Sequence, residues 1–94
     1  VDCHNIKQAA KYLWQKHPDC KMFYHQTNLI INLYANGKLK QLTNKPVHLD
    51  FCKTLVNAFL IPIADFYDLL TTDAQQLFLE LINEKALIPV LDDE

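Results

Sequence analysis

The chain has 94 residues, half of them hydrophobic, and a formal net charge of −2. This length suits one domain, over residues 1–94, and is too short for an enzyme with its own cofactor domain. With one glycine and no serine, it has neither a glycine-rich phosphate loop nor a serine nucleophile. No apolar run reaches the roughly 20 residues that a transmembrane helix needs.

The first predicted element is a helix over residues 5–17. Ile6, Ala9, Leu13 and Trp14 recur at helical spacing, Asn5 is a good N-cap, and Pro18 would end the helix. Residues 1–18 are thus expected to form an N-terminal helical segment, and residues 19–94 the core of the domain.

The middle of the chain predicts a small antiparallel sheet. Residues 21–26 and 29–35 are rich in strand-forming side chains, and residues 38–42 alternate polar and apolar side chains. Asn36-Gly37 separates the last two strands, and this dipeptide favours a tight type I′ hairpin turn.

The last part of the chain predicts three helices and an edge strand. Pro46 begins a helix of about 14 residues, residues 64–70 form a short helix, and Thr71 or Thr72 caps a helix that follows. Residues 87–91 form a strand that must lie at an edge, because Pro89 has no N–H to donate. The side chains expected in the core are Trp14, Phe59, Phe66, Phe78 and Leu81.

The predicted fold class is α+β. We expect a winged-helix-like domain in which a small antiparallel sheet, including the hairpin, packs on about four helices. The order of elements differs from a simple winged helix, because the hairpin precedes the three later helices.

His48-Leu49-Asp50 has the spacing that begins the iron site of two-histidine, one-carboxylate oxygenases. No histidine follows His48, and on a helix His48 and Asp50 point in different directions, so we predict a solvated helix start instead. Zinc is equally disfavoured, because a helix over residues 6–17 would hold the Cys3-His4 pair about 18 Å from His17 and Cys20. No catalytic, metal or cofactor-binding residue is predicted, and the three cysteines are expected to be reduced thiols.

Charge is distributed unevenly along the chain. Residues 1–53 hold eight lysines against three acids, whereas residues 54–94 hold one lysine against eight acids. Tyr34, Lys38 and Lys40 are the candidate partner-binding residues, because a basic aromatic strip at the hairpin would suit an acidic peptide or a single-stranded nucleic acid. The absence of arginine makes nucleic acid the less favoured partner.

Residues from "INLYANGKLKQL" through "VHLDFCKTLVNAFLIPIADFYDLLTTDAQQLFLELINEKALIPV" resemble the C-terminal winged-helix domain of the JmjC-type, cupin-like ribosomal oxygenases. The resemblance rests on Asn36-Gly37 and on the apolar spacing of the helices that follow, and it covers about two-thirds of the chain. It departs from the family pattern at Glu84-Lys85, where a glycine is common, and in lacking terminal aromatic residues.

This resemblance implies a non-catalytic module attached to an upstream barrel that binds Fe(II) and 2-oxoglutarate and hydroxylates a ribosomal protein. Residues 5–17 would then be the end of a dimerisation region, and the partner would be the oxygenase domain, a second protomer or a peptide. Winged-helix modules that recruit leader peptides are also similar, and would use residues 38–42 with residues 47–59 as a groove. A nucleic-acid-binding winged helix is a further alternative, and a cytoplasmic location is expected.

Overall fold

The computed structural model describes residues 5–90, which form three α-helices, two short 3-10 turns and six strands. An α+β class with small antiparallel sheets is therefore confirmed, with three α-helices in place of about four. In chain order the elements are α1 (Ile6–Ala9), β1 (Leu13–Lys16), β2 (Met22–Gln26), β3 (Ile30–Ala35), β4 (Lys38–Thr43), α2 (Pro46–Asn57), β5 (Leu60–Ile61), the 3-10 turns η1 (Ile63–Asp65) and η2 (Tyr67–Leu69), α3 (Thr72–Asn83) and β6 (Leu87–Val90).

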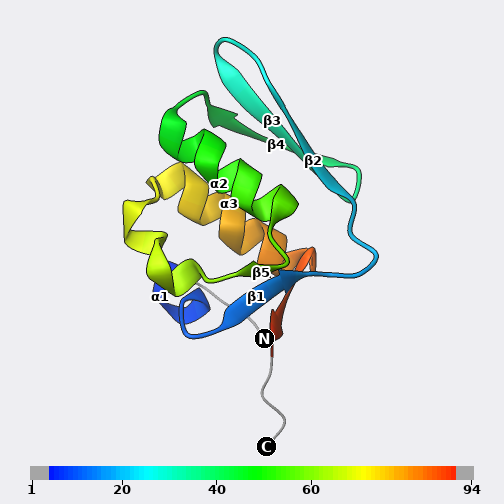
Figure 1. The fold of residues 1–94 in the computed structure, drawn as a ribbon, viewed down its shortest axis with the longest axis vertical. Helices are drawn as coiled ribbons and strands as arrows, with labels where there is room; N and C mark the ends of the chain where they lie inside the picture. Colours follow the sequence, from blue (N-terminus) through cyan, green and yellow to red (C-terminus); the bar gives the residue numbers. More distant parts are fainter. Residues whose placement is uncertain (1–4, 91–94) are drawn as a thin grey trace, which may run out of the picture.

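The helices α2 and α3 lie between two three-stranded antiparallel sheets (Figure 1). One sheet has the strand order β2-β3-β4 and packs on α2 and α3. The other has the order β5-β1-β6 and lies at the opposite end of the helix pair, next to α1. Pro89 belongs to β6, which is an edge strand as predicted.

The hairpin turn forms as the sequence predicts. Asn36 and Gly37 both have positive φ, at 53° and 79°, so that Ala35 faces Lys38 directly across a two-residue loop. This register places Ile31, Leu33 and Ala35 of β3 on the buried face of the sheet. Leu42 of β4, opposite Ile31, is buried with them.

Three aromatic side chains connect the second sheet to both long helices. Trp14 of β1 is fully buried and meets Phe78 of α3 edge-on, with ring centroids 6.2 Å apart. Phe78 in turn packs against Phe51 of α2, also at 6.2 Å. The indole N–H of Trp14 donates to the Ala9 carbonyl oxygen at 2.8 Å, so its one polar group is satisfied inside the core.

The predicted helix over residues 5–17 is wrong beyond its first turn. Asn5 caps α1 by accepting a hydrogen bond from the Gln8 amide, but α1 has only four residues. Residues 13–16 instead form β1, the central strand of the second sheet, and His17 extends the ladder to Ala86. β5 and β6 satisfy the backbone hydrogen bonds of β1 on both sides, and Trp14 is still buried. These interactions outweigh the preference for a helix that the apolar spacing indicates.

Phe59, predicted in the core, is 79% exposed because α2 ends at Asn57 and β5 begins two residues after Ala58. Ile61 of β5 takes the buried position instead. The short helix predicted over residues 64–70 is replaced by η1 and η2, and Phe66 between them is partly buried against the core. Among residues 5–90, the longest helices have 12 residues, and none is long and apolar enough to cross a membrane.

Candidate functional site

β4 is an edge strand whose outer side has backbone groups available for a partner. The backbone groups of successive residues in β4 point alternately toward β3 and away from it. The Asn44 amide donates to the Leu29 carbonyl oxygen, so Lys38, Lys40 and Leu42 are the residues whose backbone hydrogen-bonds to β3. Leu39 and Gln41 therefore direct their N–H and C=O groups away from β3, and within residues 5–90 no strand pairs with that side of β4.

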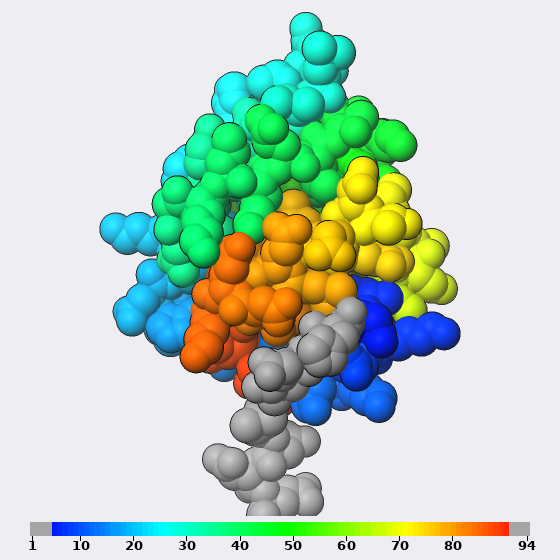
Figure 2. Space-filling model, turned by 180° about the vertical axis from the view of Figure 1, so that it is seen from behind, coloured from blue at the N-terminus to red at the C-terminus, as the bar shows by residue number. Residues whose placement is uncertain are grey.

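An open groove of about 440 Å³ runs between β4 and α3. Figure 2, which views the molecule from behind, shows β4 passing beside α3 on this face. Leu77 of α3 faces the groove together with Asp73, Gln76 and Glu80, one and two turns apart on the helix. The groove thus combines a strand edge with carboxylates, and Leu39 of β4, at 50% exposure, is an exposed apolar side chain beside them.

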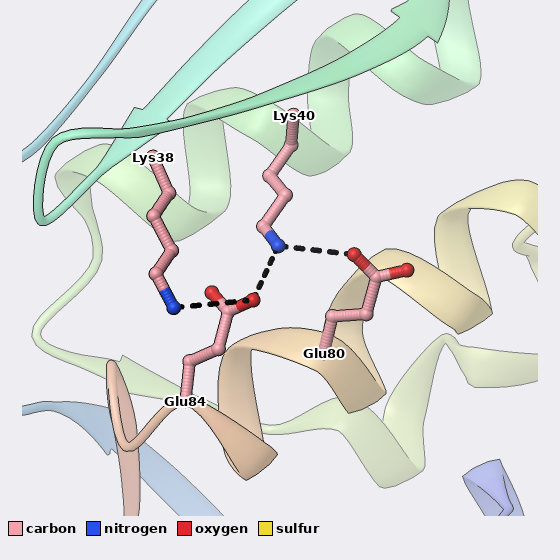
Figure 3. A network of polar contacts seen from close by, with 4 residues as sticks. All are labelled: Lys38, Lys40, Glu80 and Glu84. Atoms are coloured by element: carbon pink, nitrogen blue, oxygen red, sulfur yellow. Dashed lines mark hydrogen bonds and ion pairs between the residues drawn. The ribbon is translucent and has the colours of Figure 1, made fainter.

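Lys40 connects the two walls of this groove (Figure 3). Its Nζ donates to Glu84 Oε2 at 2.6 Å and to Glu80 Oε1 at 3.0 Å, and its side chain is only 11% exposed. Burial disfavours the ammonium charge, but the hydrogen bonds to Glu84 and Glu80 outweigh it and raise the pKa of Lys40. Lys38 is more exposed and lies 3.9 Å from Glu84 Oε2.

The predicted partner-binding residues do not form one surface. Tyr34 faces away from α3 on the outer side of the sheet, where its ring stacks on Phe23 at 4.8 Å. Lys38 and Lys40 point to the other side, toward Glu80 and Glu84. The basic aromatic strip expected for an acidic peptide or a nucleic acid is therefore divided between two faces, and Lys40 is neutralised by its carboxylate partners.

His48, predicted to be solvated, is 1% exposed and holds three elements together. Its Nδ1 lies 2.6 Å from the Thr43 oxygen at the end of β4, and its Nε2 lies 2.6 Å from Thr71 Oγ1 at the start of α3. Because a carbonyl oxygen can only accept, Nδ1–H donates to Thr43. Nε2 and the Thr71 hydroxyl share a second hydrogen bond, and Thr71 Oγ1 also accepts from the Ala74 amide. Both ring nitrogens are thus used structurally.

A helical pattern in the sequence could have revealed this buried histidine. His48, Phe51, Cys52 and Leu55 recur at i, i+3, i+4 and i+7, and all four are buried on one side of α2. Val47 is only partly buried, and Phe59 lies beyond the end of α2. Asp50 is exposed but lies beyond the first turn of α2, which holds no acidic residue.

Cys20 and Cys52, the two cysteines within residues 5–90, lie in surroundings that suppress thiol reactivity. Cys52 is fully buried in α2, and this burial raises its pKa to about 11. Burial also raises the pKa of Cys20, although Lys16 and a backbone hydrogen bond from Asn36 oppose that effect. A catalytic thiol requires the opposite, a lowered pKa.

Within residues 5–90, no three His, Cys, Asp or Glu side chains are grouped as a metal site would require. The Cys3-His4 half of the zinc pattern lies outside the described residues. His17, in the other half, accepts a hydrogen bond at Nδ1 from the Asp19 amide at 3.1 Å.

Comparison with known proteins identifies no relative of this chain: no protein-family model, no curated protein and no solved structure matches it.

Proposed function

We propose that this chain is a non-catalytic protein-interaction module that binds an extended peptide segment along the outer edge of β4. The single observation that carries this proposal is the edge of β4 itself, where Leu39 and Gln41 direct unpaired backbone groups outward beside an open groove. A peptide that adds as a further strand gains main-chain hydrogen bonds there without any rearrangement of the sheet.

The wall of the groove supports a particular peptide chemistry. Leu39 of β4 supplies apolar surface at 50% exposure, whereas Leu77 is only 4% exposed. Asp73 of α3 is exposed and has no ion pair in the described part of the chain. Glu80 is already paired with Lys40. An extended segment with an apolar side chain near Leu39 and a lysine or arginine near Asp73 therefore complements the groove best.

This geometry favours α3 over α2 as the helical wall. The peptide-recruitment alternative assigned residues 47–59 to the groove, yet α2 packs beneath β2 and β3, and the residues lining the groove opposite β4 belong to α3. The proposed site therefore consists of the strand at residues 38–42 and the helix α3.

The test is a selection followed by two matched proline variants. Peptides of 12 residues are selected from a random displayed library on the wild-type chain, and the dissociation constant of the best binder is measured. Gln41→Pro removes one outward N–H of β4 and leaves the β3–β4 ladder intact. Gln26→Pro is the matched control, because the Gln26 N–H also points outward, on the other edge of the same sheet.

The proposal requires Gln41→Pro to weaken binding by about tenfold or more, the loss of roughly one hydrogen bond. Gln26→Pro should bind as the wild type does. Equal affinity of the wild type and Gln41→Pro would overturn the proposal.

We further propose that the module is winged-helix-like and belongs to a 2-oxoglutarate-dependent, JmjC-type oxygenase of ribosomal proteins in the cytoplasm. The support is the resemblance carried by Asn36-Gly37, by the helix beginning at Pro46 and by the helix beginning at Thr72. In such a protein the β4 edge would contact the oxygenase domain, a second protomer or a substrate segment. The sequence encoded upstream of Val1 tests this assignment: it must contain a barrel with a His-x-Asp motif and a later histidine.

A further inference from the structure

A second surface, separate from β4, lies between α2 and the segment with the two 3-10 turns. It is a pocket of about 350 Å³, here named the α2 pocket, and is lined mainly by Val47, Phe51, Phe66, Leu69 and Leu70, together with Asp50. Phe51 is buried at 2% exposure, whereas Leu69 is 71% exposed. An aliphatic side chain this exposed beside an apolar pocket is a feature of interaction sites.

The elements that form the α2 pocket carry acidic side chains. Asp50 lines the pocket from α2, and Asp65 and Asp68 lie in η1 and η2, next in sequence to Phe66 and Leu69. All three are exposed, none has an ion pair within residues 5–90, and no lysine lines the pocket. A partner with basic residues flanking an apolar face is complementary to this charge.

The backbone around the α2 pocket favours a helical partner over an extended one. The amides of Asp65, Phe66, Leu69 and Leu70 are all used in the 3-10 turns, and the carbonyls of Tyr67 and Leu70 also accept from Gln75 Nε2. An extended strand would find no free strand edge here. A helix satisfies its own backbone and needs only side-chain contacts.

The geometry therefore points to a docking site: we infer that the α2 pocket binds the apolar face of a basic amphipathic helix from a partner protein. Val47, Asp50 and Thr54 lie at i, i+3 and i+7 along α2, about 10 Å or two turns in length. Apolar side chains spaced over two turns of a partner helix match that length. This inference is independent of the β4 edge, because the two sites share no residue.

The test uses three synthetic 15-residue peptides and the complete chain labelled with ¹⁵N. The first peptide carries leucines at helical spacing among alanines and lysines; the second has the same composition with the leucines dispersed around the helix. The third keeps the leucine stripe and has glutamate in place of lysine. Each is titrated, and the amide shifts of Val47, Thr54, Leu69 and Leu70 are followed.

Two leucine variants control for non-specific contact. Leu69→Ser alters the rim of the α2 pocket, and Leu29→Ser alters a leucine of similar exposure, at 79%, in the β2–β3 turn. Neither is expected to unfold the chain, because both side chains are solvent-exposed, and their amide spectra verify this.

The expected result is that the lysine peptide with the leucine stripe shifts the four amides. Leu69→Ser should lower the affinity for this peptide about tenfold, and Leu29→Ser should leave that affinity unchanged. The glutamate peptide should bind at least several-fold more weakly at low salt. Absence of binding, equal binding of the dispersed or glutamate peptide, or shifts located elsewhere would overturn the inference.

Discussion

Lys40 Nζ donates to Glu84 Oε2 at 2.6 Å, joining an edge strand from the first half of the chain to the C-cap residue of α3. The two halves of the sequence differ in charge, and this contact is where a lysine of the basic half meets the acidic half. It holds β4 against the helix while Leu39 and Gln41 face outward. The proposed binding edge is therefore fixed in place before any partner arrives.

Replacement of Lys40 by methionine should lower the free energy of unfolding by about 1–2 kcal/mol. The change removes two charge-assisted hydrogen bonds and leaves Glu80 and Glu84 close to each other without their shared cation. Lys38→Met is the matched control, expected within about 0.5 kcal/mol of wild type, because Lys38 is 61% exposed. Urea unfolding measures both; equal losses in the two variants would contradict the assigned role of Lys40.

The same interaction should make stability depend on alkaline pH. Because the pKa of Lys40 is raised in the folded state, its stabilisation is fully present below the unfolded value of 10.5 and is lost as pH rises through the higher folded value. Above about pH 10.5 the wild type should lose stability more steeply than Lys40→Met, which retains all other titrating groups. Parallel stability curves for the two proteins would argue against the raised pKa.

Thr71→Ala should cost about 1–3 kcal/mol of folding free energy. The variant loses the N-cap bond to the Ala74 amide and the hydroxyl that pairs with buried His48. Thr72→Ala, at the adjacent exposed threonine, should change stability by less than about 0.5 kcal/mol. Thermal or urea unfolding of the pair tests whether His48 connects β4 to α3.

The two described cysteines should differ strongly in their reaction with a thiol reagent at pH 8. In a Cys3→Ser, Cys20→Ser variant, buried Cys52 should label at least about a thousandfold more slowly in buffer than in denaturing urea, because labelling needs opening of the core. Cys20, half-buried, should label much closer to its unfolded rate in a Cys3→Ser, Cys52→Ala variant. Rapid native labelling of Cys52 would contradict the packing of α2.

Local signals in the sequence were sufficient where one turn or one cap decides the structure. Asn36-Gly37 determines the hairpin, Thr71 caps α3 and Pro89 lies on an edge, each for a reason that involves only a few neighbouring residues. Phe78 and Leu81 are buried as the apolar spacing of α3 predicts, whereas Trp14 is buried on a strand and not on the predicted helix.

Long-range pairing could not be predicted in the same way. The spacing of Ile6, Ala9, Leu13 and Trp14 fits a helix, and only the arrival of β5 and β6 on either side of residues 13–16 makes a strand preferable. The candidate partner-binding residues are divided between two faces for a related reason. The position of Lys40 opposite Leu33 directs its side chain toward Glu80 and Glu84. Partners 40 and 44 residues away are not visible in a local pattern.

Amide hydrogen exchange along β4, with and without the selected peptide, tests the proposed binding edge most directly. In the free protein the Leu39 and Gln41 amides should exchange quickly, while those of Lys40 and Leu42, bonded to β3, are protected. On addition of the peptide, Leu39 and Gln41 should slow by about tenfold or more, with no change at Met22, Tyr24 or Gln26 on the other edge. Protection that appears on β2, or slowing at neither edge, would contradict binding of an extended segment to β4.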